Sequence, residues 1–168
     1  MVKVVAYGIG ALAASLLLCV DVYAQRQLSK AATSGRATSL EGYAYADNNC
    51  QVVDPPPEII IEQAPVHGIV CLRRGDILLN PPMEGNLSKL SHCAGKKASG
   101  GFHVIYLSQR DYTGADHVRY TVRFTTVRHS VDITLKVLPA WAPADVDAPD
   151  GEPGQQPGPI PRCTALVS

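Results

Sequence analysis

Apolar and polar side chains alternate with a period of two in two neighbouring segments of the chain. Residues 117–124 (HVRYTVRF) carry an apolar side chain at every second position, and residues 130–137 (SVDITLKV) repeat the pattern. Because successive side chains of a strand point to opposite faces, both segments are predicted to be antiparallel strands, joined by residues 125–129 as a hairpin loop. The predicted core positions of the first strand are Val118, Tyr120, Val122 and Phe124, and its predicted solvent positions are His117, Arg119, Thr121 and Arg123.

Shorter apolar runs predict further strands. Residues 58–63 (EIIIEQ) and 66–72 (VHGIVCL) are rich in β-branched side chains, as buried strands usually are. Residues 74–76 (RGD) are expected to turn the chain into a short strand at 77–79, and residues 102–108 are another strand candidate. The pattern therefore favours an all-β domain with an antiparallel β-sandwich architecture.

The segment between these strands, residues 80–101, is the least regular part of the predicted domain. It begins with Asn-Pro-Pro and ends with Ser-Gly-Gly, and a short helical turn is expected near Asn86–Leu90. A structureless loop of this length is uncommon in a compact domain unless it is functional or tethered. Cys93 lies within it and favours tethering by a disulfide.

Composition divides the chain into four parts. Residues 25–46 are rich in Gln, Ser, Thr, Ala and Gly without a sustained period, which is typical of a flexible lead-in. From Pro139 onward Pro, Gly, Asp and Ala dominate, so this stretch is not expected to bury enough apolar surface to offset the entropy of ordering it. The predicted parts are a signal peptide at 1–24, a flexible lead-in at 25–46, a β-sandwich at 47–139 and a disordered tail at 140–168.

The N-terminus has the three regions of an export signal. Lys3 supplies the positive charge, residues 4–20 form the apolar run, and Val22-Tyr23-Ala24 ends in a small residue suited to cleavage after Ala24. A retained membrane anchor and a lipoprotein acylated at Cys19 are the alternatives, although the apolar run is slightly short and three leucines precede Cys19. A periplasmic or secreted protein is predicted.

The cysteine content agrees with export. After cleavage the chain would retain an even number of cysteines, which in an oxidising compartment are expected to pair. The four residues are Cys50, Cys71, Cys93 and Cys163. Sequence does not select among the three possible connectivities, and we favour Cys50 with Cys93 and Cys71 with Cys163. A zinc site is disfavoured because the chain has no Cys-x-x-Cys pair.

Charge and composition narrow the possible partners. The chain has fifteen basic and fifteen acidic residues, so it lacks the basic excess of nucleic-acid-binding proteins. Thirteen prolines and fourteen glycines among 168 residues favour short strands and turns over long helices. No nucleic-acid partner is expected, and no stable membrane span after signal cleavage.

One part of the sequence carries a family signature. Tyr106 followed by residues 111–122 (DYTGADHVRYTV) resembles the Tyr-x-Pro and Phe/Tyr-x-Gly-x-Asp-x-Phe-x-Tyr-x-Val pattern of bacterial cadherin-like and immunoglobulin-like repeats. The resemblance covers about residues 50–138 and implies an immunoglobulin-like β-sandwich. Ser108 and Val118 depart from the pattern, which has Pro and Phe there. In those repeats, acidic residues between tandem domains bind calcium. Because a single domain is predicted here, the resemblance does not imply calcium binding by this chain.

Three residues of this signature have expected structural roles. Gly114 suits a tight turn, and Asp116 is expected to cap the turn by accepting hydrogen bonds from backbone N–H groups. Tyr120 is expected to pack inward with its hydroxyl bonded to the backbone, as in a tyrosine corner. These roles concern architecture, because a fold does not by itself define an activity.

No motif for catalysis is present. The chain has no Gly-rich phosphate loop, no His-Glu-x-x-His and no Gly-x-Ser-x-Gly, and no cofactor is expected. His103 and His117 are weak candidates for a metal site, since both are predicted at outward positions of neighbouring strands. Solvated histidines on strands are common, and turn capping explains Asp111 and Asp116 better than acid–base catalysis.

Three classes of function remain open at this point, and the third is an envelope-associated protein retained by its N-terminus. The first is a non-enzymatic binding or structural module of the periplasm or cell exterior, whose partner is an envelope or extracellular protein or a glycan. It would act through a sheet face, an edge strand or residues 80–101. The second is a small metal-binding protein, or an accessory subunit of an exported enzyme. Stoichiometric metal binding that is lost in His103→Ala would distinguish the second class.

Overall fold

The structure is a computed structural model. Of the 168 residues it describes 25–80, 90–125, 128–141, 143–145, 148–151 and 154–163. The predicted signal peptide, residues 1–24, lies outside this part of the chain. Within the described ranges, no helix is long and apolar enough to cross a membrane.

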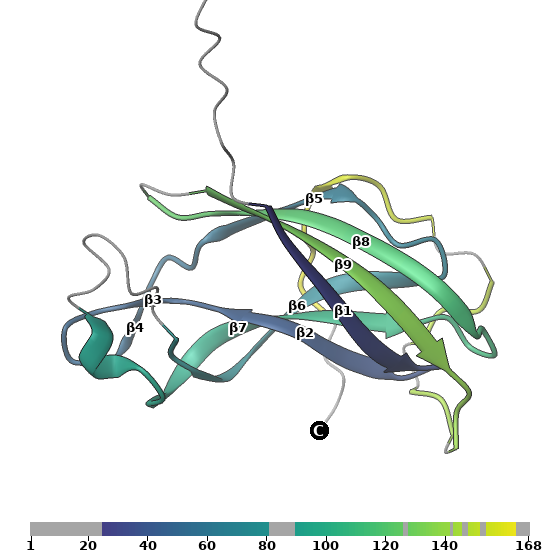
Figure 1. Cartoon of the computed structure of the whole chain (residues 1–168), viewed down its shortest axis with the longest axis horizontal. Coiled ribbons are helices and arrows are strands. Elements are labelled where there is room, and N and C mark those ends of the chain that lie inside the picture. The colour runs from purple at the N-terminus through teal and green to yellow at the C-terminus, as the bar shows by residue number, and fades with distance from the viewer. Residues whose placement is uncertain are drawn as a thin grey trace, which may run out of the picture.

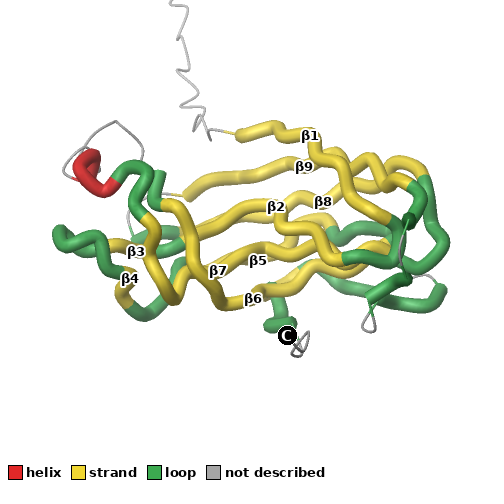
Figure 2. The backbone as a smooth tube through the Cα atoms, turned by 90° about the horizontal axis from the view of Figure 1, so that it is seen from below, coloured by secondary structure: helices red, strands yellow, loops and turns green. Residues whose placement is uncertain are grey.

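Nearly all regular structure in the described residues is β-strand (Figure 1). One short helical turn lies next to the β3–β4 hairpin, drawn in red in Figure 2. In chain order the strands are β1 (Gln25–Thr33), β2 (Ala37–Tyr43), β3 (Tyr45–Ala46), β4 (Val52–Val53), β5 (Glu58–Gln63), β6 (Gly68–Leu78), β7 (Lys97–Ser108), β8 (Gly114–Arg123), β9 (Arg128–Leu138) and β10 (Gly158–Pro159).

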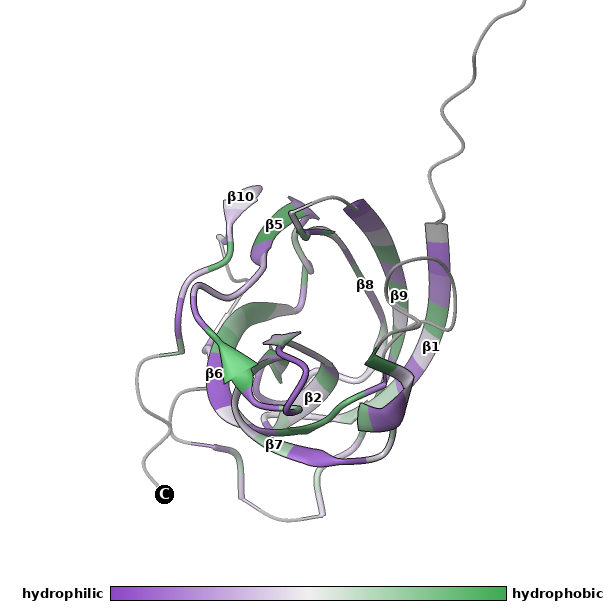
Figure 3. Ribbon diagram, turned by 90° about the vertical axis from the view of Figure 1, so that its left-hand side faces the viewer, coloured by the Kyte–Doolittle hydropathy of each residue, from purple (hydrophilic) through white to green (hydrophobic). Residues whose placement is uncertain are grey.

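The strands form two main sheets that pack face to face. The larger sheet has the order β1-β9-β8-β5-β10, the smaller one the order β2-β7-β6, and β3 and β4 form a separate hairpin. Figure 3 shows both sheets curving around a common interior. Neighbouring strands are antiparallel except β1, which runs parallel to β9. The predicted all-β sandwich is thereby confirmed.

The β8–β9 hairpin confirms the alternating pattern of the sequence. Val118 pairs with Ile133 and Tyr120 with Val131, and all four side chains are buried in the main core. Val122 is fully buried and Phe124 packs against the same core, so the predicted inward face is observed.

Thr121 is an exception to the predicted solvent face of β8. It is only 5% exposed, because its hydroxyl donates a hydrogen bond to Glu62 of the neighbouring strand β5. The long side chain on the adjacent strand covers the short one, an effect that the pattern of a single strand does not reveal.

The β5 strand has the predicted bounds, but residues 66–79 differ from prediction. The expected turn at 74–76 is wrong, because β6 continues through it from Gly68 to Leu78. The register of β6 against β7 shifts between Gly75 and Ile77. A β-bulge of this kind bends a strand without ending it, and glycine in a strand often marks one.

Part of the predicted loop at 80–101 is a strand. Strand β7 begins at Lys97, five residues before the predicted strand at 102–108. A short helical turn covers Leu90–Cys93, and residues 81–89, which include most of the expected helical turn at Asn86–Leu90, lie outside the described residues. The apolar partner of β7 in this part is the far end of β6, where Ile77 pairs with Ala98.

Residues 25–46 are not a flexible lead-in: they form β1, β2 and β3. Strand β1 aligns with β9 over its full length, with Leu28 opposite Ile133 and Ala32 opposite Val137. Its polar composition gives no alternating apolar pattern from which a strand could be predicted. An edge strand can nevertheless be stabilised by backbone pairing with few apolar side chains. The domain therefore includes residues before 47.

The described residues between 143 and 163 are also part of the fold, so the expectation of a disordered tail is corrected for them. The Asp145 carboxylate accepts a hydrogen bond from the Ala37 N–H at 2.7 Å, and Asp145 N–H donates to the Gly35 carbonyl at 2.6 Å. Further along, β10 pairs with β5, and Gln155 both donates to and accepts from the Val70 backbone at 2.8 Å.

The last described residues attach the tail to β6. Leu72 donates to the Pro161 carbonyl and accepts from the Cys163 N–H, at 2.8 and 2.9 Å. The Cys71–Cys163 disulfide holds the same point covalently. The order of this segment comes from backbone pairing and a covalent bond, neither of which depends on apolar composition.

Candidate functional site

Asp116 is at the centre of a buried hydrogen-bond cluster. It is 6% exposed, and its carboxylate accepts hydrogen bonds from the N–H groups of Val66 and His67 at 2.9 Å and of His117 at 2.8 Å. The Tyr106 hydroxyl donates to the same carboxylate at 2.8 Å. Asp116 does accept from backbone N–H groups, but two of its donors belong to the β5–β6 connection rather than to its own turn.

The expected tyrosine corner is formed by a different residue. The Tyr120 hydroxyl is hydrogen-bonded to the Tyr43 hydroxyl at 3.0 Å, whereas the Tyr106 hydroxyl donates to the His67 carbonyl at 3.1 Å. Tyr106 and Tyr120 are both fully buried. The sequence signature placed the right residue types in the core and assigned the backbone contact to the wrong tyrosine.

Gly114 has the expected role in the turn before β8. Its φ is 140°, and a side chain carbon there would lie 2.9 Å from the Tyr112 hydroxyl oxygen. That hydroxyl donates to the Ala115 carbonyl at 2.6 Å, so the tyrosine ring closes over the glycine. A larger residue would meet both an unfavourable backbone angle and a steric contact.

The Tyr43–Tyr120 pair is buried between the sheets and does not offer an acid or a base near neutral pH. Burial raises the pKa of Tyr43 to about 12. Burial, and then the nearby Tyr43 hydroxyl, raise the pKa of Tyr120 further above its ordinary value. On the open side of this pair, Glu41 forms ion pairs with Arg26 at 3.4 Å and Lys30 at 3.7 Å.

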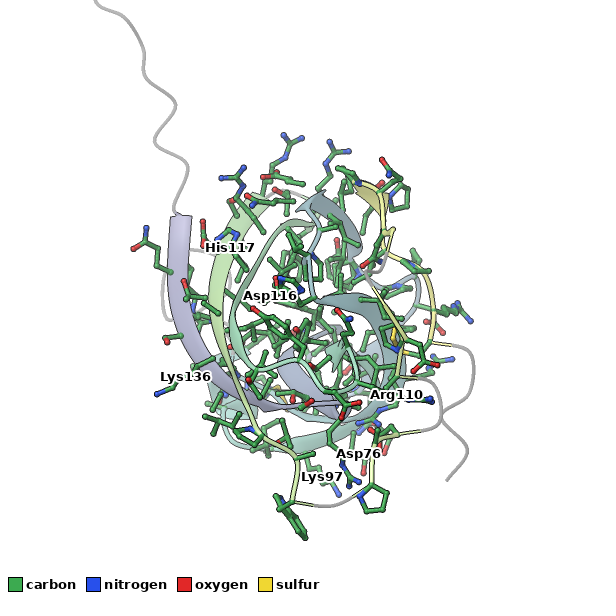
Figure 4. The ribbon with its side chains drawn as sticks, turned by 90° about the vertical axis from the view of Figure 1, so that its right-hand side faces the viewer. Asp76, Lys97, Arg110, Asp116, His117 and Lys136 are labelled. Carbon is green, nitrogen blue, oxygen red and sulfur yellow. A yellow bond between two sulfur atoms is a disulfide. The ribbon has the colours of Figure 1, made fainter. Side chains whose placement is uncertain are left out.

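His103 and His117 do not form a site together. The prediction that they lie on neighbouring strands is wrong, because His103 is on β7 of the smaller sheet and His117 is on β8 of the larger one. His117 Nε2 lies 2.5 Å from the Asp132 carboxylate, and His103 Nε2 lies 2.8 Å from the Asp76 carbonyl. Figure 4 shows His117 toward the outer side of the sheet and Asp116 among the interior side chains.

Asp76 belongs to a surface cluster on the smaller sheet, also labelled in Figure 4. Its carboxylate contacts the Lys97 ammonium at 2.9 Å and accepts from the Ser99 hydroxyl at 2.8 Å. Lys97 first, and then Ser99, lower the pKa of Asp76. The cluster joins β6 to β7 and is solvent-exposed, so it contributes to the sheet surface rather than to a binding cleft.

Both favoured disulfides are present. Cys50 is bonded to Cys93 and Cys71 to Cys163, which fits an oxidising environment outside the cytoplasm. His92 lies beside the first of them, and the possible ligand atoms of Cys50, His92 and Cys93 lie within 4.8 Å of one another. Since both sulfurs are in a disulfide, neither is available as a thiolate ligand.

A groove opens at the end of the sandwich where the β3–β4 hairpin lies. We call it the aromatic groove; its volume is about 640 Å³, and its rim carries the Arg123–Glu58 ion pair at 3.3 Å. The rings of Tyr45 and Phe124 meet edge to face with centroids 5.4 Å apart. The lining residues are Tyr45, Ala46, Val53, Asp54, Pro55, Pro56, Glu58, Arg123, Phe124 and Thr125.

The opposite end of the sandwich carries the most exposed large apolar side chain among the described residues. Trp141, the only tryptophan of the chain, is 90% exposed, and Leu138 three residues before it is 41% exposed. We call residues 138–141, which begin at the last residue of β9, the tryptophan loop. Tryptophan is enriched at protein interfaces, where its ring is buried and its N–H group finds a hydrogen-bond partner.

A second depression lies over β1 and β9 on the outer face of the larger sheet. It has a volume of about 460 Å³ and is lined by Gln27, Leu28, Ser29, Asp132 and Thr134. Its lining is largely polar, and it lacks the aromatic side chains of the groove.

Neither the groove nor the tryptophan loop was predicted from the sequence. Trp141 was assigned to a disordered tail because of the prolines and alanines around it, and β3 and β4 are too short to give a periodic signal. The available signal was the tryptophan itself, since a single large aromatic residue in an otherwise small and polar stretch is unusual.

Comparison of the chain with known proteins identifies no family. The resemblance of residues 50–138 to bacterial cadherin-like and immunoglobulin-like repeats therefore stays a prediction, and the sandwich is what the structure shows. No protein-family model matches the chain, and no curated protein or solved structure is significantly similar to it.

Proposed function

We propose that this protein is an exported, non-enzymatic β-sandwich module that binds other proteins in the periplasm or outside the cell. The observation that carries the proposal is the 90% exposed Trp141 in the tryptophan loop. Tryptophan is among the residues most enriched at the energetic centres of protein interfaces. The two disulfides and the predicted signal peptide support export.

The size of the exposed side chain supports a binding role. An aromatic residue of this kind buries about 150–250 Å² in an interface, which corresponds to about 4–6 kcal/mol of apolar transfer free energy before the costs of association. Leu138, three residues earlier, is 41% exposed and adds a second apolar side chain to the tryptophan loop. In the free protein this apolar surface stays in water and does not stabilise the fold. Its burial in a complementary pocket of a partner would supply the transfer free energy to binding.

The candidate acid–base groups support a non-enzymatic role. Asp116 is saturated by donors of the fold, His117 is held by Asp132, and His103 bridges Ser39 and the Asp76 carbonyl. Groups that hold structural hydrogen bonds are poorly placed to transfer protons to a substrate. An exported enzyme is one possible partner, for which this chain would be an accessory subunit.

The experiment compares capture by three forms of the mature, disulfide-bonded chain, residues 25–168. Immobilised wild-type protein, Trp141→Ala and the control Leu78→Ala are exposed to native envelope and culture fluid, and bound proteins are quantified. Leu78 is 64% exposed on β6 and is a matched apolar truncation outside the tryptophan loop.

We expect one protein to bind wild type and Leu78→Ala equally and to be lost with Trp141→Ala. The purified partner should then bind wild type at least about 30-fold more tightly than Trp141→Ala, the range of an interface hot spot. Equal capture by all three forms would contradict the proposal. Turnover of a substrate by the isolated chain would contradict its non-enzymatic part.

A further inference from the structure

We infer that the aromatic groove of one copy receives Trp141 of a second copy, so that the protein assembles head to tail. This inference rests on the proposed function and names its partner as another molecule of the same chain. It is carried by two surfaces at opposite ends of the same strands, which are an exposed tryptophan and an aromatic groove that the described residues leave open.

The positions of the two surfaces follow from the β8–β9 hairpin. Gly114, the first residue of β8, pairs with Val137, so the tryptophan loop follows at that end of the sheet. Arg123, the last residue of β8, pairs with Arg128, and Phe124 in the groove lies at this other end. In Figure 1 the β3–β4 hairpin lies at the left and the end of β9 at the right.

The separation of the two surfaces excludes an intramolecular contact. Strand β8 has ten residues, and at about 3.3 Å per residue it spans about 33 Å. The tryptophan loop is anchored at its start by the hydrogen bond from Ser34 N–H to the Leu138 carbonyl. Trp141 therefore cannot reach the groove of its own molecule, but a second copy can bring its loop to it.

The lining of the groove is complementary to an indole ring. Tyr45 and Phe124 offer aromatic faces and edges, and Pro55 and Val53 add apolar surface. An indole also carries one N–H donor that needs an acceptor when it is buried. The Glu58 carboxylate lies on the groove rim, where Arg123 also offers a guanidinium for contact with an aromatic face.

The interface formed in this way is heterologous, because different surfaces of the two copies meet. Each dimer retains one free tryptophan loop and one free groove, so association continues into a chain of molecules or closes into a ring. The formal net charge of zero means that long-range repulsion between copies is small. The groove is lined mainly by apolar and aromatic side chains, and the tryptophan loop consists of such residues. Both surfaces are therefore suited to burial in a contact that repeats from one copy to the next.

The test uses the single tryptophan as its reporter. Sedimentation velocity and tryptophan emission are measured on disulfide-bonded residues 25–168 over a concentration series. We expect the sedimentation coefficient to rise with concentration and the emission maximum to shift to shorter wavelength in parallel, since Trp141 is the only tryptophan. Trp141→Ala should remain monomeric, with association weakened by at least about 30-fold.

A groove variant provides the complementary half of the test. Val53→Asp, at a 40% exposed position of the lining, should remain monomeric with the emission of an exposed indole. Val66→Asp is the matched control at a 50% exposed valine that does not line the groove, and it should associate like wild type. An equimolar mixture of Trp141→Ala and Val53→Asp should form a 1:1 dimer and nothing larger, because together they hold one intact groove and one intact loop.

A peptide makes the result independent of the folding of Val53→Asp. A peptide of residues 138–145 (LPAWAPAD) is titrated with Trp141→Ala protein, which contains no other tryptophan. A blue shift of the peptide emission that saturates supports the inference. A wild-type protein that stays monomeric with constant emission, or association that persists in Trp141→Ala, overturns it. If the wild type is monomeric while Trp141→Ala still loses an envelope partner, the proposed function stands and the self-assembly falls.

Discussion

Replacing the buried residue Asp116 by alanine is expected to be among the most destabilising single substitutions in this protein. The carboxylate is 6% exposed and is the shared acceptor for Val66 N–H, His67 N–H, His117 N–H and the Tyr106 hydroxyl. It therefore ties the β5–β6 connection to the start of β8. Truncation removes one acceptor and leaves several buried donors without it.

The magnitude follows from these contacts. A hydrogen bond to a charged group contributes about 1.5–3 kcal/mol, and a buried donor left unsatisfied costs about 1–3 kcal/mol. Tyr106 retains the His67 carbonyl as a partner, so the main loss concerns the N–H groups of Val66 and His67. We expect Asp116→Ala to lower the free energy of unfolding by about 3–6 kcal/mol, a large share of the about 5–15 kcal/mol of an ordinary domain.

The assay is equilibrium unfolding in guanidinium chloride of the oxidised mature chain, followed by far-ultraviolet circular dichroism. The control is Asp150→Ala, which removes a 78% exposed carboxylate paired with Arg110 at 3.1 Å and should cost about 1 kcal/mol or less. Asp116→Asn should fall between wild type and Asp116→Ala, because its amide cannot accept all the bonds of the carboxylate. If Asp116→Ala and Asp150→Ala unfold at the same denaturant concentration, the role assigned to the buried carboxylate is wrong.

Three further predictions concern a disulfide, a buried tyrosine and the apolar core. Replacing Cys71 and Cys163 together by serine opens a 92-residue separation and should lower stability by about 4–5 kcal/mol in the chain-entropy model, with new proteolytic cleavage in the tail as a second readout. Raising the pH from 10 to 12 should lower the free energy of unfolding by about 2 kcal/mol in total for Tyr43, because burial raises its pKa to about 12 while the unfolded chain ionises near 10. Unfolding of wild type and of Tyr43→Phe over this pH range measures the difference. Ile133→Ala should cost about 2–5 kcal/mol in thermal or chemical unfolding, whereas Thr134→Ala on the outer face should cost less than about 1 kcal/mol.

The sequence predicted those strands whose side chains report their environment. In β8 and β9 one face is buried and the other is wet, so apolar residues recur at every second position, as Val118, Tyr120 and Val131 illustrate. Strand β5 is equally clear because Ile59 and Ile61 are both buried. In these segments local composition and tertiary position agree, which is why a single sequence is enough.

The strands that sequence missed are stabilised by contacts that leave little trace in composition. Strand β1 depends on backbone pairing with β9, and only Leu28 and Ala32 contribute to the core. The tail depends on Gln155, on short β10 and on the bond to Cys163. The aromatic groove could not be predicted for a different reason: it combines β3, the cis Asp54–Pro55 segment and the end of β8, which only the folded chain brings together.

The sheet edges of this protein are covered or charged, which leaves the two ends of the sandwich for contact with a partner. Unpaired edge strands invite association with other chains, and proteins usually cover them. Here β10 covers β5, and the tail from Gln155 to Cys163 covers β6. On the other side, the ion pairs of Glu41 with Arg26 and Lys30 place charged side chains between β1 and β2. With its sides covered or charged in this way, the sandwich presents apolar surface at two opposite ends, the aromatic groove and the tryptophan loop, and an axial contact between copies is the association that this distribution favours.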